Sequence, residues 1–156
     1  MDYRIREIRP SEYSILSDFL YEAIFVPDGT EKPPKDIVKQ PELQVYIADF
    51  GKKDDRCLVA EAEGKIAGAV WVRIMNDYGS IDGETPSLAI ALYEEYRRLG
   101  IGTALMETMV RLLRSKGYKQ VSLSVQKANY AVSMYEKVGF KVFRENQEEY
   151  IMVCKL

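Results

Sequence analysis

A short apolar strand, a glycine-rich loop and an amphipathic helix follow one another in the second half of the chain. The strand is "SLAIAL" (Ser87–Leu92), and a second strand, "QVSLSV", follows the helix at residues 120–125. Leu105, Met109 and Leu112 repeat on one face of the helix between them. Two strands joined by a crossover helix pair in parallel, with a right-handed connection. This unit constrains the fold most, because ligands of such sheets bind beyond the carboxyl ends of the strands.

The remaining segments predict a mixed sheet with helices on both of its faces. Periodicity and turn residues give the order β, α, α, a β-meander, and then β–α–β–α–β–β. Ser11 is expected to cap the first helix, which should end near Ile24, and Gly51 should close a short second helix. The long proline-rich segment between these helices is either a functional loop or a mobile surface connection.

Composition excludes several classes of protein. The chain has 156 residues, 47% hydrophobic and 29% charged, and we expect one globular domain over residues 1–156. A net charge of −2 argues against a nucleic-acid partner. The chain contains no histidine, and Cys57 and Cys154 match no ligand spacing, so no metal site is expected. No apolar run approaches the ~18 residues of a membrane span, so we expect a cytoplasmic protein without a membrane partner.

The loop "RRLGIG" after the first strand has the chemistry of an anion site. A helix N-terminus presents unpaired backbone N–H groups and the positive end of the helix dipole. Gly100 and Gly102 remove side chains that would block close approach, and Arg97 and Arg98 add positive charge. Read alone, the glycines are also compatible with a tight turn that binds nothing. The segment lacks the Gly-Lys-Ser/Thr ending of a nucleotide P-loop, and Leu105 stands where a dinucleotide fingerprint needs glycine.

Two motifs in the right order narrow the interpretation. "RRLGIG" has the form R-x-x-G-x-G, and "NYAVSMYEKVGF" follows from Asn129 to Phe140. Together they resemble the GNAT family of acyl-CoA N-acyltransferases over residues 88–140, and the first half of the chain agrees in the order of its elements. The resemblance implies a GNAT-like α+β fold with three α/β/α layers. Its central sheet is mixed and mostly antiparallel, and the parallel pair formed by residues 87–92 and 120–125 splays apart.

The resemblance also implies acetyl-CoA as the bound cofactor. In this family the loop amides hold the pyrophosphate, the pantetheine arm lies between the splayed strands, and a backbone N–H near Leu92 would polarise the thioester carbonyl. Carried over residue by residue, the cofactor-binding positions are Ile90, Ala91, Leu92, Arg97, Arg98, Leu99, Gly100, Ile101, Gly102, Thr103, Ala104, Asn129 and Tyr135.

Two of these residues also have ordinary structural interpretations. Tyr135 corresponds to the family tyrosine that protonates or hydrogen-bonds the departing thiolate, which makes it a catalytic candidate. It equally belongs to the apolar stripe of its helix with Ala131, Met134 and Val138. Asn129 corresponds to an asparagine that contacts the cofactor arm, and it is also a good N-cap. Both roles can coexist at each position.

The acceptor side is the least determined part of the sequence. Without histidine, the base that deprotonates the amine is a carboxylate or a water chain. Glu84 is the catalytic candidate, with Asp82 beside it, because the family often places such a group just before this strand. Pro86 lies between Glu84 and the strand, and the alternative is a solvated loop carboxylate. Phe25 and Tyr78 are candidates for binding the substrate.

We therefore expect an acetyl-CoA-dependent N-acetyltransferase. It would acetylate a primary amine of a small molecule or peptide by direct attack in a ternary complex. A non-catalytic acyl-CoA-binding sensor or regulatory module is the alternative, and a nucleotide-binding transferase is disfavoured by the missing lysine. The protein would be a monomer or a homodimer, and its acceptor is not specified by the sequence.

Overall fold

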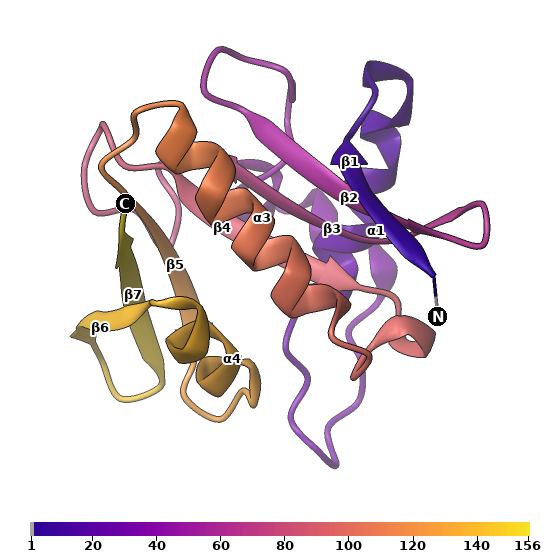
Figure 1. Ribbon diagram of the computed structural model, residues 1–156. Helices are drawn as coiled ribbons and strands as arrows, with labels where there is room; N and C mark the ends of the chain where they lie inside the picture. Colours follow the sequence, from indigo (N-terminus) through magenta and orange to yellow (C-terminus); the bar gives the residue numbers. More distant parts are fainter. Residues whose placement is uncertain (1) are drawn as a thin grey trace.

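A computed structural model describes residues 2–156, which form one seven-stranded sheet (Figure 1). The strand order across the sheet is β1-β2-β3-β4-β5-β7-β6. Neighbouring strands are antiparallel except for β4 and β5, which are parallel. This matches the predicted mixed, mostly antiparallel sheet. The strands are β1 (Tyr3–Glu7), β2 (Arg56–Ala62), β3 (Lys65–Arg73), β4 (Ser87–Leu92), β5 (Gln120–Gln126), β6 (Lys141–Glu145) and β7 (Glu149–Lys155).

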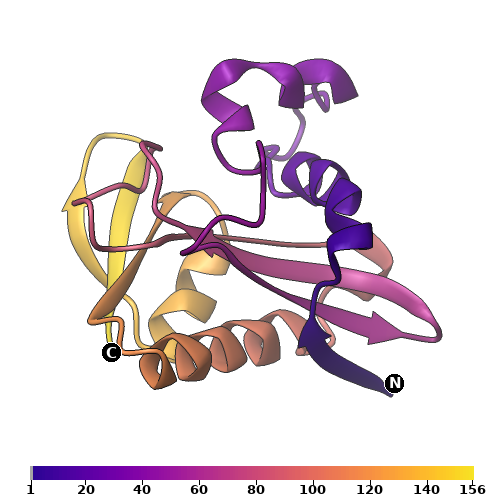
Figure 2. The ribbon, with the colours of Figure 1, turned by 90° about the horizontal axis from the view of Figure 1, so that it is seen from above.

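Helices cover both faces of the sheet and complete three layers (Figure 2). One face carries the N-terminal helices, and the other carries the two long C-terminal ones. The first group is the 3₁₀ helix η1 (Pro10–Ile15), α1 (Leu16–Glu22), the 3₁₀ helix η2 (Lys35–Lys39) and α2 (Pro41–Gln44). The second group is α3 (Ile101–Ser115) and α4 (Ala131–Val138), and the short 3₁₀ helix η3 (Glu94–Tyr96) precedes α3.

Strand β4 contributes to both hydrophobic cores because its side chains alternate between the two faces. Leu88, Ile90 and Leu92 pack with the core under α3 and α4, which also holds Leu105 and Met109. Ala89 and Ala91 face the other core, where α1 packs against Trp71 of β3. The small alanines leave room for α1, whose Leu16 and Phe19 are almost completely buried. The side chains of residues 88–92 are therefore all committed to packing, and the backbone edge toward β5 is the part of β4 left for other contacts.

Strands β4 and β5 are joined at their beginnings only. Ser87 pairs with Ser122, and the Ser122 N–H donates to the Pro86 carbonyl at 3.0 Å. After this point β4 continues along β3 as far as the pair Gly68 and Leu92, whereas β5 follows β7 over its whole length. The two strands therefore separate toward their carboxyl ends, as the predicted splayed pair requires.

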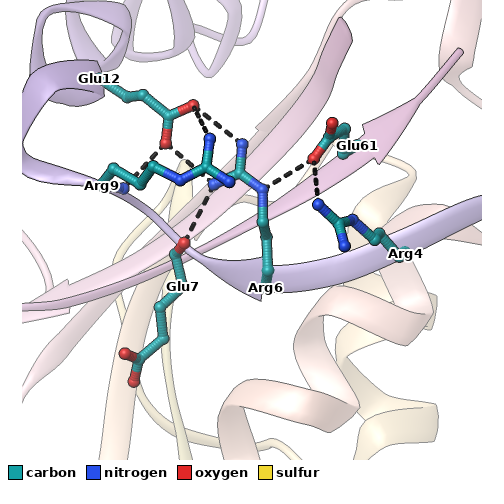
Figure 3. Close-up of polar contacts among 6 residues, drawn as sticks. All are labelled: Arg4, Arg6, Glu7, Arg9, Glu12 and Glu61. Carbon is teal, nitrogen blue, oxygen red and sulfur yellow. Dashed lines mark hydrogen bonds and ion pairs between the residues drawn. The ribbon is translucent and has the colours of Figure 1, made fainter. Parts of the chain in front are cut away.

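A cluster of charged side chains connects β1 to η1 and to β2 (Figure 3). Arg6 of β1 donates to both carboxylate oxygens of Glu12 at 2.9 Å and, through Nε, to Glu61 of β2 at 2.8 Å. Glu12 also accepts the backbone N–H of Arg9 at 2.8 Å. Arg9 is thus the N-cap residue of η1, which corrects the prediction of Ser11. Hydrogen bonds from Arg6 and from the Arg9 backbone lower the pKa of Glu12 to about 2.

We expect Glu12→Gln to lower the free energy of unfolding by about 1–2 kcal/mol at pH 7, because charge-assisted bonds to Arg6 are lost. The folded pKa of Glu12 is depressed, so its contribution is present above the unfolded value of about 4.5 and is lost as the pH falls toward 2. Urea denaturation of both proteins at pH 7, 4.5 and 3 measures the difference. The exposed Glu7→Gln is the control, and a wild-type advantage that stays constant down to pH 3 would contradict the assignment.

The second helical region differs from the prediction in its boundaries. Instead of one short helix closed by Gly51, the chain forms η2 and then α2, which begins at Pro41, where proline is favoured in a first turn. Tyr46 and Ile47 lie beyond α2 in turns and pack on the core around α1. Among the helices that the structure describes, none is long and apolar enough to cross a membrane. The predicted cytoplasmic location stays a prediction.

Candidate active site

A cavity of about 1220 Å³ opens where β4 and β5 separate. Its walls come from four parts of the chain that are distant in sequence. They are the end of α1 with the loop that follows it (residues 21–33), the carboxyl half of β4, the loop that leads into α3, and the first half of α4 with the residues before it. In Figure 1 the loop after α1 extends past the end of β4, toward the beginning of α3. The lining includes Phe25, Ile90, Ala91, Leu92, Arg97, Arg98, Gly100, Gly102, Thr103, Asn129 and Tyr135.

The edge of β4 that faces this cavity carries unpaired backbone groups. In an antiparallel pair, alternate residues bond to the partner strand. The Tyr93 N–H donates to Ala67 of β3 at 3.0 Å, so the odd-numbered residues bond to β3. The backbone groups of Ile90 and the N–H of Leu92 therefore point toward β5, which has already diverged. An extended ligand with amide groups can add here as a strand.

The loop before α3 presents a second row of backbone donors. Ala104 is the first residue of the helix whose N–H finds a helical acceptor, the Gly100 carbonyl at 3.2 Å. Within residues 2–156, no side chain caps this N-terminus, and the first turn holds no acidic residue. The N–H groups of residues 101–103 thus retain their capacity for an external acceptor. A 15-residue helix with an open N-terminus favours an anion at this position.

The two glycines of the loop have different physical roles. Gly100 has a φ of +84°, a left-handed conformation that strains other residues, although a Cβ there would meet open space. Gly102 is an ordinary helical residue whose Cβ would lie 3.4 Å from Leu92 Cδ1, a normal contact. The protein itself can therefore hold a small side chain at position 102. A larger side chain at position 102 would instead obstruct the cavity in front of the helix.

Tyr135 is both a core residue and a cavity residue. It is only 8% exposed, packs beside Phe140 with ring centroids 6.2 Å apart, and belongs to the core under α3. It also lines the cavity. Burial in apolar surroundings raises the pKa of its phenol to about 12, with a smaller contribution from Tyr130. The hydroxyl is therefore protonated at neutral pH and is able to donate a proton.

Asn129 has a structural role at the N-terminus of α4. Its side-chain oxygen accepts the Ala131 N–H at 2.9 Å, and its carbonyl accepts the Val132 N–H at 3.2 Å. The residue also lines the cavity. Because the oxygen is engaged by the helix, the amide NH₂ is the part of the side chain that is able to donate to a ligand.

A family model described as the acetyltransferase (GNAT) family matches residues 17–140. This chain belongs to the GNAT acetyltransferase family. The predicted family membership is thus confirmed. Among curated relatives, an N-alpha-acetyltransferase of Sulfurisphaera tokodaii is 31% identical in an alignment of 130 residues that covers 73% of this chain and 73% of that protein. A probable N-acetyltransferase, camello, of Xenopus tropicalis is 37% identical over 89 residues, 55% of this chain and 38% of that protein. These names support the predicted N-acetyltransferase activity.

Solved structures confirm the GNAT fold over the whole chain. The PaiA N-acetyltransferase of Thermoplasma acidophilum, in complex with coenzyme A, superposes with a TM-score of 0.72 at 22% identity and covers 100% of both chains. The putative acetyltransferase yncA of Salmonella typhimurium, with acetyl-CoA, gives a TM-score of 0.69 at 16% identity, covering 100% of this chain and 95% of the other. Both GNAT structures hold a coenzyme A species.

Two of the predicted site residues lie away from the GNAT cavity. Glu84 and Tyr78 belong to the loop between β3 and β4 and are exposed, Tyr78 to 55%. This loop leads into the beginning of β4, whereas the cavity lies at its end, about 20 Å further along the strand. Neither residue lines the cavity. The prediction that Glu84 acts there as the base is not supported by its position.

The same cavity is also lined by charged residues that lie outside the two sequence motifs. Glu22, Asp28 and Glu94 bring carboxylates to its lining, together with Lys32, whose Nζ lies 4.0 Å from Glu94. The substrate candidate Phe25 lies in the same part of the chain, but nothing in the sequence distinguishes these charged positions. Three of the predicted cofactor positions, Leu99, Ile101 and Ala104, do not line the cavity.

Proposed function

We propose that this protein transfers the acetyl group of acetyl-CoA to a primary amine of a small molecule or peptide, in a ternary complex. The observation that carries the proposal is the pair of open backbone rows on one cavity. One row is the uncapped N-terminus of α3, and the other is the free edge of β4 at Ile90 and Leu92. A ligand with a diphosphate and an amide-bearing arm satisfies both rows at once.

The residues present fit such a donor substrate. The N–H groups of residues 101–103 and the exposed Arg98 would hold the pyrophosphate. The helix dipole and the charge of the arginine would both stabilise its negative charge. The arm would continue along β4, where the Leu92 N–H would hold the thioester oxygen. When bound, acetyl-CoA supplies an acetyl group activated as a thioester.

The protons would be handled by two different parts of the cavity. Tyr135 would give its proton to the departing sulfur, because burial keeps the phenol protonated. On the opposite wall, a carboxylate of Glu22, Asp28 or Glu94, acting directly or through water, would receive the proton of the acceptor amine. Direct attack then requires only that both substrates are held at short range.

A mass-spectrometric assay with acetyl-CoA tests the proposal. The amine panel contains N-terminal peptides, free lysine, polyamines and aminoglycosides, and the expected result is an increase of 42 Da in at least one amine with stoichiometric release of free thiol. Tight coenzyme A binding with no turnover of any amine, and no slow thioester hydrolysis, would contradict an enzyme and support a non-catalytic sensor.

A further inference from the structure

The two neighbouring arginines of the cofactor loop are in different environments. Arg98 is exposed, with a positive φ of 64°. Arg97 is half-buried and already engaged by the protein. Its Nε donates to the Leu92 carbonyl at 3.1 Å, and its Nη2 donates to the Glu22 carbonyl at 3.4 Å and lies 3.9 Å from the Glu22 carboxylate. An arginine committed in this way has fewer donors to offer a phosphate.

These contacts join the two walls of the cavity. Leu92 is the last residue of β4, and its N–H is the proposed donor to the thioester oxygen. Glu22 is the last residue of α1, where the loop of residues 23–34 begins. A cation at this helix end bonds a carbonyl that the helix leaves unsatisfied. An ion pair of 3.9 Å at partly exposed side chains adds little, so the two carbonyl contacts define the geometry.

We propose that Arg97 is a positioning residue that ties the loop of residues 23–34 to the catalytic end of β4, while Arg98 is the arginine that binds the pyrophosphate. This inference rests on the proposed function, because it assigns residues 23–34 to the acceptor. Leu92 also packs over Gly68 of β3, where a Cβ would lie only 2.7 Å from its Cγ, and a Cβ at Gly102 of α3 would lie 3.4 Å from its Cδ1. Arg97 adds the only one of these restraints that reaches α1.

The test compares Arg97→Gln with Arg98→Gln, a matched pair on adjacent residues. Calorimetry measures coenzyme A affinity, and hydrogen–deuterium exchange measures the amides of residues 23–34. We expect Arg98→Gln to weaken coenzyme A binding about tenfold, with a reduced salt dependence. We expect Arg97→Gln to leave this affinity within about twofold and to speed amide exchange in residues 23–34 about tenfold.

Kinetics with the best amine of the panel separates positioning from general stability. Arg97→Gln should raise the amine KM about tenfold and change kcat less. Arg97→Lys, which keeps the charge and reaches one carbonyl, replaces Arg97→Gln if the latter does not fold. Coenzyme A affinity that falls as far as in Arg98→Gln, or unchanged exchange in residues 23–34, would overturn the proposal. Exchange and calorimetry need no turnover, so they judge Arg97 even if no amine is acetylated.

Discussion

Gly102→Glu is expected to weaken coenzyme A binding at least 100-fold. The new carboxylate would stand in the first turn of α3, in front of the N–H groups that the proposal assigns to the pyrophosphate, and would occupy their acceptor position. The fold should tolerate the change, because a Cβ at position 102 meets only ordinary contacts. A negative charge at a helix N-terminus also stabilises the helix.

A loss of coenzyme A affinity without a loss of stability would show that the substitution acts on the binding site and not on the fold. Isothermal calorimetry should show the loss of affinity, while the melting temperature stays equal to wild type or rises. Gly83→Glu is the matched control: a Cβ there meets nothing within 4 Å, and the position lies outside the cavity, so coenzyme A affinity should not change. Equal affinity of the Gly102→Glu and wild-type proteins would remove the loop from the donor site.

Tyr135→Phe is expected to lower kcat about 100-fold and to leave coenzyme A affinity within about twofold. The ring would still fill its place beside Phe140, while the hydroxyl that serves the leaving sulfur is lost. Because burial raises the pKa of Tyr135 to about 12, the wild-type kcat should show no falling limb between pH 8 and 10. Steady-state kinetics over this pH range, together with calorimetry, measures both effects.

Tyr96→Phe provides the comparison, because Tyr96 is also 8% exposed and lies in the same core, outside the cavity lining. Its kcat should match that of wild type, which separates the loss of a particular proton donor from the loss of any buried hydroxyl. Full turnover by Tyr135→Phe would instead show that Tyr135 only packs in the core and that water protonates the departing thiolate.

The second half of the fold was predictable because its signals are local. The amphipathic pattern of α3, the glycine in a left-handed conformation before it and the apolar strands on either side all agree at short range. The same is true of Tyr135, whose predicted place in the core is confirmed and which also lines the cavity, while its catalytic role stays a prediction. Local consistency of this kind is what specifies an element without knowledge of its neighbours.

The errors arise where partners are distant in sequence. Ser11 looked like a cap, but Glu12 caps from within η1 because Arg6 holds it, and Arg6 is itself held by Glu61, 55 residues away. Glu84 was a candidate because the family often places a base just before this strand, but the cavity lies at the opposite end of β4. The hydrogen bond from Arg97 to Glu22 joins residues 75 positions apart, and no sequence motif predicts it.

The separation of β4 and β5 gives this sheet two edges in its interior, in addition to the outer edges at β1 and β6. An interior edge is recognised by any extended molecule through its backbone, whatever side chains the strand carries. The side chains of Ile90 and Leu92 are therefore constrained by the core against which they pack, whereas the proposed recognition of the donor's arm would depend only on the path of the main chain. Recognition of the donor through the main chain would allow the residues around the acceptor to differ between proteins that use the same donor.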